Sequence, residues 1–462
     1  MPAKEVETRN PTALGEYRTF VSALAIEGGR QSLVRDIILN NPSTSSAELM
    51  KTIGISAEEL VAIYRDLQQN EEFQLAVNSP CYSRRLMFNV ARTIVRDLSS
   101  DHDYTDRLTS GEPVSSRVIE LHTTKGTCNY NCVMCLWSDK GERTYDTTNM
   151  KGSGLMGTEE WENTLADIHK FGAKIAVFSG GGEVLLNQDF FRLLAFSHSI
   201  GLKTQLYTSG YNMAHLADDE RGQLLAMDRI RFSIHSPDED TYNAIVSMPE
   251  RAHALSKIED HLRVLLEKRD TVNSELKIGI GFVIQPLNVM QVEDIVEFAK
   301  RMGVDYLNIR RDEILVTNPL DPESEVKLRE QLLHIRTNIM NGAYRNLEID
   351  FSDNLVAFMN EEDYSLPQVP YCVLKHLRPT INPYGLWNPC DLKGEPMYAD
   401  PDFVIGDLHQ QSVANILART QQMTIPATCT SCMPSGQTGN AIFTKLLQDH
   451  ALGIDFRDQP FF

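Results

Sequence analysis

The chain has 462 residues, of which 42 % are hydrophobic and 23 % are charged, as in globular proteins of two or three domains. Its net charge of −19, from 44 basic and 63 acidic residues, disfavours binding to nucleic-acid phosphates and suits a cationic substrate or a basic partner. The first residues do not resemble a signal peptide, and no apolar run is long enough to span a membrane. We therefore expect a cytoplasmic protein with eight reduced cysteines and with neither nucleic acid nor membrane as a partner.

The N-terminal part of the chain is expected to be helical. Two Ser-x-x-Glu capping boxes, which begin at Ser45 and Ser56, predict short helices at about 46–53 and 57–69. The acidic side chains of this region oppose a helix-turn-helix that binds DNA. We expect a helical cap packed on the main domain, with docking of a peptide or protein as the alternative.

Strands and helices then alternate from about residue 117 to about residue 316. The expected strands are Val118–His122, Lys174–Ser179, Lys203–Thr208, Ile230–His235, Lys277–Ile284 and Asp305–Arg310. This repeat predicts an α/β fold with parallel strands and right-handed crossovers. Six such strands suit an incomplete barrel, a full eight-stranded barrel being the alternative, and in both the active-site groups lie at the C-terminal strand ends. We expect the repeat to end near residue 316, where the helix Glu323–Met340 follows.

Three cysteines, Cys128, Cys132 and Cys135, lie in the loop after the first expected strand. Their spacing lets three thiolates bind three corners of an iron–sulfur cube, which four cysteines normally hold, so one iron stays open. The alternatives are a tetrahedral zinc site with His122 as a nearby fourth ligand, buried structural thiols, or disulfides. The preference of soft thiolates for such clusters favours the cube.

This CxxxCxxC loop resembles the signature of the radical S-adenosylmethionine (SAM) enzymes. The resemblance implies a partial (β/α)6 TIM-type barrel and a 4Fe–4S cluster whose open iron holds SAM. It also implies reductive cleavage of SAM to a 5′-deoxyadenosyl radical, with electrons from a flavodoxin- or ferredoxin-type reductant. Where the family usually places an aromatic residue on the adenine, this chain has Met134, whose polarisable thioether can make a similar contact.

Three strand ends match positions that bind SAM in this family. Gly181, Gly182 and Glu183 follow the second expected strand and are similar to the GGE motif, in which backbone groups contact the SAM amino group. Glycines at such a turn permit positive φ and the close approach of a ligand. Thr208 ends the third expected strand, and Ser233 lies near the end of the fourth. Both match positions that contact SAM in this family.

Charged side chains at two strand ends are the candidate catalytic groups. His235 ends the fourth expected strand, and the alternative is a histidine held by hydrogen bonds inside the barrel mouth. Arg310, Arg311, Asp312 and Glu313 follow the sixth. They could bind a charged substrate or supply an acid/base pair, or they could neutralise one another as a salt-bridge cluster.

A second constellation of cysteines lies in the C-terminal part of the chain. Its members are Cys372, Cys390, Cys429 and Cys432. With a hairpin turn expected at 382–385, the pattern resembles the twitch module, a shortened SPASM extension, and implies one auxiliary 4Fe–4S cluster. A zinc knuckle is the alternative. A further possibility is that three cysteines bind iron and the fourth donates a hydrogen atom, as in some radical epimerases.

We expect three domains: an N-terminal helical cap at 1–110, a radical SAM core at 111–320 and a twitch/SPASM-like domain at 321–462. The chain looks most similar to the radical deaminases of dideoxyaminosugar biosynthesis and to aminocyclitol dehydrogenases, on cues that include Gly281–Ile284 and Asn308–Asp312. This resemblance implies hydrogen abstraction from an amino sugar, aminoglycoside or sugar nucleotide in antibiotic biosynthesis, leading to dehydration, deamination, oxidation or epimerisation. The alternative is epimerisation or cross-linking of a ribosomally made peptide. A cluster-bearing DNA regulator is disfavoured by the charge and by the glycine turn.

Overall fold

The computed structural model describes residues 29–38, 46–70, 73, 102–135, 137, 152–311, 319–359, 372, 374–396, 399–423, 429, 449 and 452–454. The chain divides into two compact units, Met1–Ser100 with Ala441–Phe462, and Asp101–Asn440. The three-domain division expected from the sequence stays a prediction.

The first unit is a small helical body. Residues 29–38 are helical, and α2 (Ser46–Ile53) and α3 (Ala57–Gln69) confirm the two short helices predicted from their capping boxes. At the start of α3, the Ser56 hydroxyl accepts a hydrogen bond from the Glu59 N–H, and the Glu59 carboxylate accepts one from the Ser56 N–H. Buried apolar residues of the three helices form the core, and Ile454 from the end of the chain packs into it.

The second unit contains a ten-stranded sheet in the order β10-β9-β8-β1-β2-β3-β4-β5-β6-β7. Its first seven strands in sequence, all parallel to their neighbours, are β1 (Val118–His122), β2 (Ile175–Ser179), β3 (Lys203–Thr208), β4 (Arg229–Ser233), β5 (Lys277–Ile284), β6 (Tyr306–Arg311) and β7 (Glu348–Phe351). The C-terminal part of the chain adds β8 (Thr380–Ile381), parallel to β1, and the antiparallel strands β9 (Leu386–Asn388) and β10 (Gly406–Asp407). In the described part, β7 pairs with β6 alone, so the barrel is partial.

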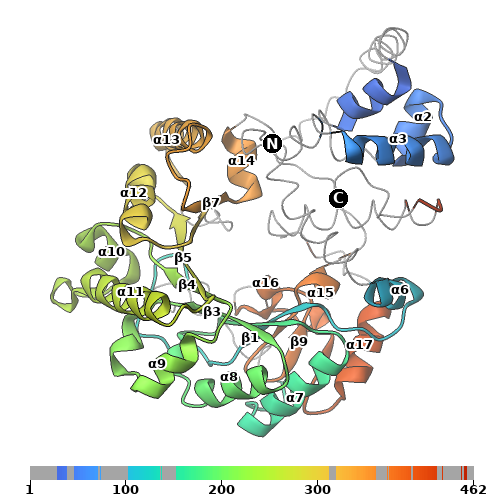
Figure 1. Ribbon diagram of the computed structural model, residues 1–462. Coiled ribbons are helices and arrows are strands. Elements are labelled where there is room, and N and C mark those ends of the chain that lie inside the picture. The colour runs from blue at the N-terminus through green and yellow to red at the C-terminus, as the bar shows by residue number, and fades with distance from the viewer. Residues whose placement is uncertain are drawn as a thin grey trace, which may run out of the picture. The chain divides into compact units, whose positions relative to one another are not determined.

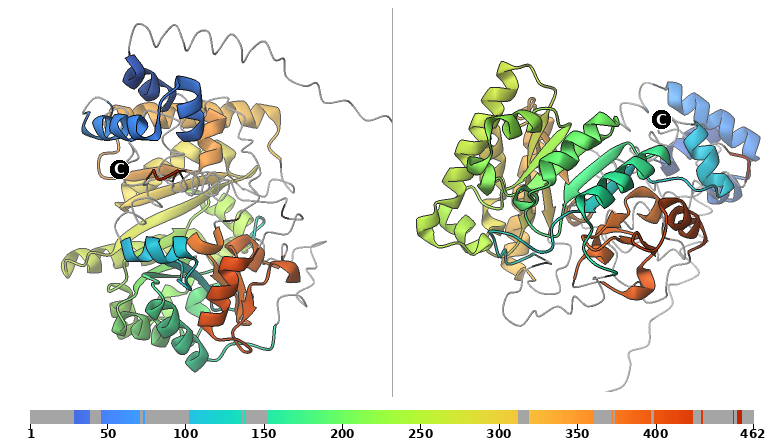
Figure 2. Two further views of the ribbon diagram at one scale, coloured as in Figure 1. Left: turned by 90° about the vertical axis from the view of Figure 1, so that its right-hand side faces the viewer. Right: turned by 90° about the horizontal axis from the view of Figure 1, so that it is seen from below.

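Helices run along the outer side of this curved sheet (Figures 1 and 2). The helices of this unit are α6 (His102–Ser110), α7 (Thr158–Lys170), α8 (Phe190–Ser199), α9 (Asp218–Leu224), α10 (Glu239–Val246), α11 (Ala254–Thr271), α12 (Val292–Met302), α13 (Pro322–Met340), α14 (Asp353–Met359), α15 (Leu374–Leu377), α16 (Asp391–Gly394) and α17 (Val413–Gln422). The short helix α16 is an exception, because it packs on the inner face, where a Cβ on Gly394 would lie 3.7 Å from the His122 ring. Strand side chains alternate between two faces. Ile230 and Phe232 of β4 are fully buried, whereas Arg229 and Arg231, which alternate with them, lie on the other face, inside the barrel.

The α/β fold with a partial barrel is confirmed, and two details differ from the sequence-based expectation. The strand–helix repeat does not end near residue 316, because α13 leads into β7, which pairs with β6. The strand β4 ends at Ser233, so His235 lies beyond it. The hairpin turn at 382–385 is confirmed, since it joins β8 to β9 and Gly385 has a φ of +75°.

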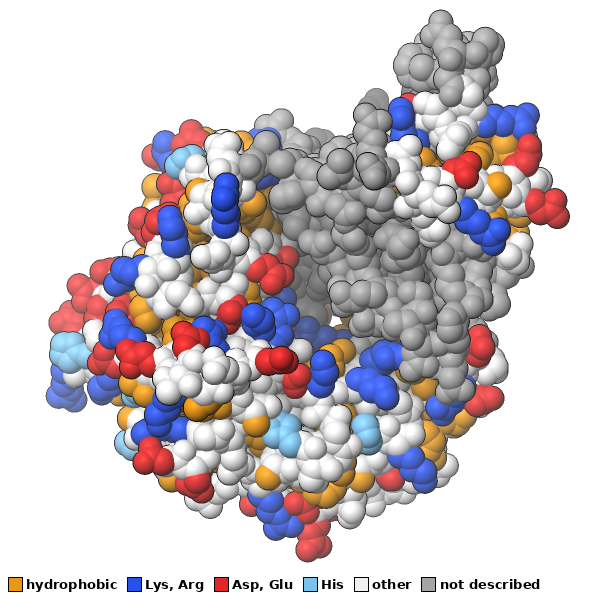
Figure 3. All heavy atoms as spheres, viewed as in Figure 1, with side chains coloured by type: hydrophobic (Ala, Val, Ile, Leu, Met, Phe, Trp, Pro, Cys, Tyr) orange, Lys and Arg blue, Asp and Glu red, His pale blue; other side chains and the backbone are white. Residues whose placement is uncertain are grey.

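The outer surface of the second unit mixes acidic and basic side chains, as Figure 3 shows. Among the described helices, none combines the length and the apolar character that crossing a membrane requires.

Candidate active site

The loop that carries the first three cysteines is fixed to the glycine turn after β2. Glu183 N–H donates to the Thr127 carbonyl at 2.9 Å, and Gly126 N–H donates to the Gly181 carbonyl. A Cβ on Gly181 would lie 2.2 Å from the Thr124 carbonyl oxygen, and one on Gly182 would lie 2.2 Å from that of Thr127. Both glycines have positive φ, +67° and +130°. Glycine is therefore required here by the contact between two loops as well as by backbone geometry.

The other end of the same loop is fixed to the end of α10. Asn131 N–H donates to the Val246 carbonyl at 3.1 Å, and Val133 N–H donates to that of Ile245 at 3.0 Å. The loop therefore leaves β1 and is held on the β2 side by the glycine turn and on the β4 side by α10.

The three thiols of this loop suit an iron–sulfur cluster. Cys128 is exposed, Cys132 and Cys135 are partly buried, and none of the three is in a disulfide. The N–H groups of Tyr130 and Trp137 donate to the sulfurs of Cys128 and Cys135 at 3.4 Å each, the kind of bond that tunes cluster thiolates.

The three thiols of this loop do not form a site for a single metal ion. In the described ranges, no three His, Cys, Asp or Glu side chains come together as the ligands of one metal ion do. Thiolates on a cube each bind a different iron and stand farther apart than ligands of one zinc. The spacing of the three cysteines along one loop is what matches three corners of a cube.

Glu183 joins the ends of β2 and β3. Its buried carboxylate accepts hydrogen bonds from the Thr208 hydroxyl at 2.6 Å, the Ser209 N–H at 2.7 Å and the Leu185 N–H at 3.1 Å. The Thr208 hydroxyl also accepts one from the Gly210 N–H at 3.0 Å. The side chains of Glu183 and Thr208 therefore make hydrogen bonds within the protein and hold the ends of β2 and β3 together. Their contact with SAM stays a prediction.

Met134 lies beside Gln285, a residue that sequence reasoning missed. The Gln285 amide nitrogen donates to the Met134 sulfur at 3.7 Å. Gln285 follows the end of β5, is 2 % exposed, and its side-chain oxygen has no partner in the described part of the chain. A polar residue directly after a buried strand was the available signal.

His235 lies inside the barrel mouth and is held by hydrogen bonds. Its Nδ1 accepts from the Val283 N–H at 3.3 Å, which places the proton of the neutral ring on Nε2. Burial, with a contribution from Arg231, lowers the pKa of His235 to about 3. A ring that is neutral at physiological pH agrees with the alternative, a histidine held by hydrogen bonds inside the barrel mouth. Catalysis by His235 stays a prediction. Nearby, the Ser233 carbonyl accepts from the Tyr242 hydroxyl at 3.2 Å.

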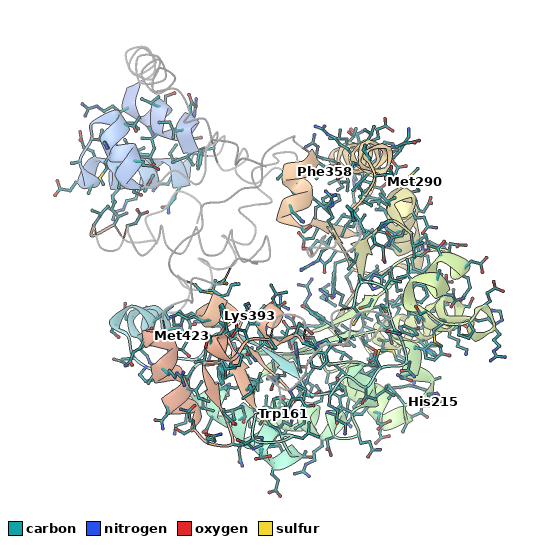
Figure 4. All side chains as sticks on the ribbon, turned by 180° about the vertical axis from the view of Figure 1, so that it is seen from behind. Trp161, His215, Met290, Phe358, Lys393 and Met423 are labelled. Atoms are coloured by element: carbon teal, nitrogen blue, oxygen red, sulfur yellow. The ribbon has the colours of Figure 1, made fainter. Side chains whose placement is uncertain are left out.

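The two arginines at the end of β6 face opposite sides of the sheet. Arg310 is in register with Val283 of β5, on the inner face. Arg311 pairs with Glu325 of α13 at 2.7 Å and lies 5.3 Å from the ring of Phe358 of α14, which Figure 4 labels. Asp312 and Glu313 lie outside the described residues.

A group of buried charges around β1 was also missed. Arg378 donates to the Glu120 carboxylate through Nε at 2.8 Å and Nη2 at 2.6 Å. His122, fully buried, lies 3.5 Å from Glu120 and 3.9 Å from Glu395. Burial raises the pKa of Glu395 to about 8. Burial alone would lower the pKa of His122, but the carboxylates of Glu120 and Glu395 raise it. Polar residues at alternate positions of an apolar strand were the signal.

Two of the C-terminal cysteines, Cys372 and Cys390, lie in the chain on either side of β8 and β9, and β8 pairs with β1. Cys372 is buried, Cys390 and Cys429 are partly buried, and Cys432 is outside the described residues. Burial raises the pKa values of both the Cys372 and the Cys429 thiols, and the charge of Cys429 adds to the effect on Cys372. The positive charge of Lys393, labelled in Figure 4, offsets part of the rise in the pKa of Cys429. Two of the four predicted ligands therefore lie close enough to interact.

Comparison with known proteins agrees with this arrangement. Residues 124–299, which include the cysteine loop and the glycine turn, match the family described as the Radical SAM superfamily. This part of the chain is similar to a radical SAM domain. Such a domain implies a 4Fe–4S cluster and SAM as its cofactors.

One curated protein and two solved structures are also similar to the chain. A probable GTP 3′,8-cyclase of Thermoplasma volcanium is 30 % identical over 193 residues, 41 % of this chain and 51 % of that protein. The chain thus spans about half the length of this curated relative. The structure of SuiB from Streptococcus suis is similar with a TM-score of 0.52 and 13 % identity over 69 % of each chain. The structure of SuiB bound to precursor peptide SuiA has a TM-score of 0.50 and 13 % identity over 69 % of this chain and 68 % of that one. At these identities the similarity to SuiB shows the fold alone.

Proposed function

We propose that the chain is a radical SAM enzyme that acts on an amino sugar, aminoglycoside or sugar nucleotide. The observation that carries the proposal is the loop of Cys128, Cys132 and Cys135, locked onto the glycine turn at the C-terminal ends of β1 and β2. When bound, the 4Fe–4S cluster supplies the electron that cleaves SAM. The outcome can be dehydration, deamination, oxidation or epimerisation.

The residues of the chain hold, orient and protect the reacting groups. The three thiolates bind the cluster, and backbone groups of the turn at Gly181 and Gly182 contact the SAM amino group. Tyr130 of the cysteine loop packs against Tyr211 and Tyr242, with ring centroids 5.6 and 6.2 Å apart. These rings anchor the loop and reduce the access of water. Abstraction of hydrogen needs close, fixed contact with the target carbon, so such rigidity serves the reaction.

The C-terminal module holds an auxiliary 4Fe–4S cluster in this proposal. Its ligands are Cys372, Cys390, Cys429 and Cys432. The interaction between the Cys372 and Cys429 thiols supports their common role. The physiological electron donor is a flavodoxin or ferredoxin.

Two comparisons bear on the substrate. The curated relative is named for GTP, a phosphorylated nucleotide, which favours a sugar nucleotide within the proposed class. The structure of SuiB bound to a precursor peptide favours the second candidate, modification of a ribosomally made peptide. That candidate predicts that a peptide, rather than a sugar, increases the cleavage of SAM.

The test is the formation of 5′-deoxyadenosine by the full-length protein after anaerobic reconstitution with iron and sulfide and reduction by dithionite. Wild type should form it, and the triple variant Cys128→Ala, Cys132→Ala, Cys135→Ala should not. The triple variant should lose about four of about eight iron atoms. No 5′-deoxyadenosine from reconstituted wild type, or equal amounts from the triple variant, would contradict the proposal.

A further inference from the structure

Among the described residues, two arginines inside the barrel, Arg231 and Arg310, form no ion pair with a carboxylate. The guanidinium of Arg231, on β4, lies over the ring of Tyr207, on β3, at 3.5 Å from the ring centroid. The two residues are partners in the register of these strands. Tyr207 thus orients the planar guanidinium through a stacking contact that leaves its donors free for another group.

A glycine on the next strand provides the space for this arginine. A Cβ on Gly281 of β5 would lie 3.0 Å from both Cδ and Nε of Arg231. A glycine within a strand often marks the close approach of another group. Here Gly281 accommodates the shaft of Arg231 along the inner face of the sheet.

The charges around Arg231 leave it unneutralised. No carboxylate of the described residues pairs with it, and its Nε is buried without a hydrogen-bond partner. Arg310, on β6, likewise makes no ion pair within the described ranges, whereas Arg378 forms an ion pair with Glu120. The positive charges of Arg310 and Arg378 both act on Arg231.

The pKa of Tyr207 is affected by the same positive charges. Burial alone would raise the pKa of its hydroxyl, but Arg378 and Arg231 outweigh burial and lower it. Burial raises the pKa of the Asp350 carboxyl on β7, and Arg310 offsets part of this effect. An uncompensated buried charge is costly, and proteins keep such groups where a ligand supplies the opposite charge.

We infer that Arg231 and Arg310 together bind an anionic group of the substrate, a phosphate or a carboxylate, inside the barrel. The inference rests on the proposed function and selects, within its substrate class, the molecules that carry such a group. Arg231 lies two residues before Ser233, one step deeper than the rim residues predicted to bind SAM. Two guanidiniums that approach from β4 and β6 can hold the oxygens of one anion with charge-assisted hydrogen bonds.

The experiment measures the binding of two probes, pyrophosphate and citrate, to the reconstituted full-length protein by anaerobic calorimetry. Arg231→Gln and Arg310→Gln remove the two charges. Arg311→Gln is the matched control, because Arg311 is the next residue on the same strand but pairs with Glu325 on the outer side. Arg231→Lys keeps the charge without the planar fork and is the second variant should Arg231→Gln not fold.

Wild type should bind at least one probe, and Arg231→Gln and Arg310→Gln should each weaken it about tenfold or more. Arg311→Gln should stay within about twofold, and Arg231→Lys should fall between wild type and Arg231→Gln. Tighter binding of pyrophosphate identifies a phosphate as the anion, and tighter binding of citrate identifies a carboxylate.

Three results would overturn the inference: no binding of either probe to wild type, equal effects of all three glutamine variants, or loss of SAM affinity without loss of probe affinity in Arg231→Gln. The last result would assign the anion to the SAM carboxylate. The formation of 5′-deoxyadenosine by wild type separates this inference from the proposed function. If wild type forms it while probe binding is unaffected by the variants, the inference fails and the function stands. If wild type forms none while the variants lose the probe, the function fails and the anion site stands.

Discussion

Arg378 and Glu120 form an ion pair that joins the C-terminal module to the first strand of the barrel. Two guanidinium nitrogens of Arg378 approach the Glu120 carboxylate at 2.8 and 2.6 Å, and the Ser179 hydroxyl donates to the same carboxylate. Burial alone would raise the pKa of Glu120, but Arg378 and then His122 lower it. The carboxylate is therefore charged in the folded protein and depends on its partner for that charge.

Removal of either partner should destabilise the protein, and removal of both should cost less than the sum. Arg378→Met leaves the Glu120 charge buried without its partner, which should lower the free energy of unfolding by about 2 to 3 kcal/mol. This cost is below that of a fully buried pair because 33 % of the Arg378 side chain is exposed. Glu120→Gln combined with Arg378→Met should recover about 1 kcal/mol or more in a double-mutant cycle by urea unfolding. Arg192→Met, which breaks an exposed pair with Glu162 at 2.8 Å, should change stability little. Additivity within error would show that the two residues are not coupled.

The sequence was sufficient for the elements that are defined by local pattern. The capping box at Ser56, the strand Lys277–Ile284 and the turn before Gly385 lie where the pattern predicts them, because periodicity, caps and turn residues act over a few positions. The cysteine loop and the glycine turn could be paired in advance, because parallel strands bring their C-terminal ends to one edge. That the glycines support the loop through the Thr124 and Thr127 carbonyls was not predictable from spacing.

Contacts between distant segments were beyond local pattern. Arg378 is 258 positions from Glu120, and the cue that could have been used, a charged residue within a barrel strand, does not name its partner. Arg231 was overlooked for the same reason, although the sequence alternates Arg229, Arg231 and Ser233 with buried apolar residues. The strand β7 was missed because it is short and follows a long helix, so its hydrophobic pattern is weak.

Replacement of Gly182 by alanine should prevent the cysteine loop from docking. The new Cβ would lie 2.2 Å from the Thr127 carbonyl oxygen at a φ of +130°. We expect a loss of about 3 kcal/mol or more in the free energy of unfolding, and a reconstituted protein with about four fewer iron atoms. Gly201→Ala is the matched control, since Gly201 also has positive φ, +86°, but nothing lies within 4 Å of its Cβ. It should cost about 1 kcal/mol and leave the iron content unchanged. Equal effects of the two substitutions would contradict the docking role.

Stability should fall as the pH is lowered below about 6.5, partly because of His235. Its pKa is about 3 in the folded protein and about 6.5 in the unfolded chain, so between these values the unfolded state binds one more proton. Stability from this group is complete above pH 6.5 and decreases by about 1 kcal/mol for each pH unit below it.

Urea unfolding at several pH values from 5 to 7.5 checks this expectation. His235→Gln should reduce the slope of stability against pH, while His215→Gln, at an exposed position, should leave it unchanged. A slope that is the same in wild type and His235→Gln would show that the ring is not held neutral.

The auxiliary cluster predicts a second, separable set of iron atoms. Reconstituted wild type should contain about eight iron atoms, and the double variant Cys372→Ala, Cys390→Ala about four. The remaining cluster should still change its electron paramagnetic resonance signal when SAM is added, because its ligands lie in the loop after β1. Cys81→Ala, which removes a cysteine of neither constellation, should retain about eight. If wild type holds about four iron atoms with one zinc, the C-terminal cysteines form a zinc site, because the same four thiolates satisfy a tetrahedral ion.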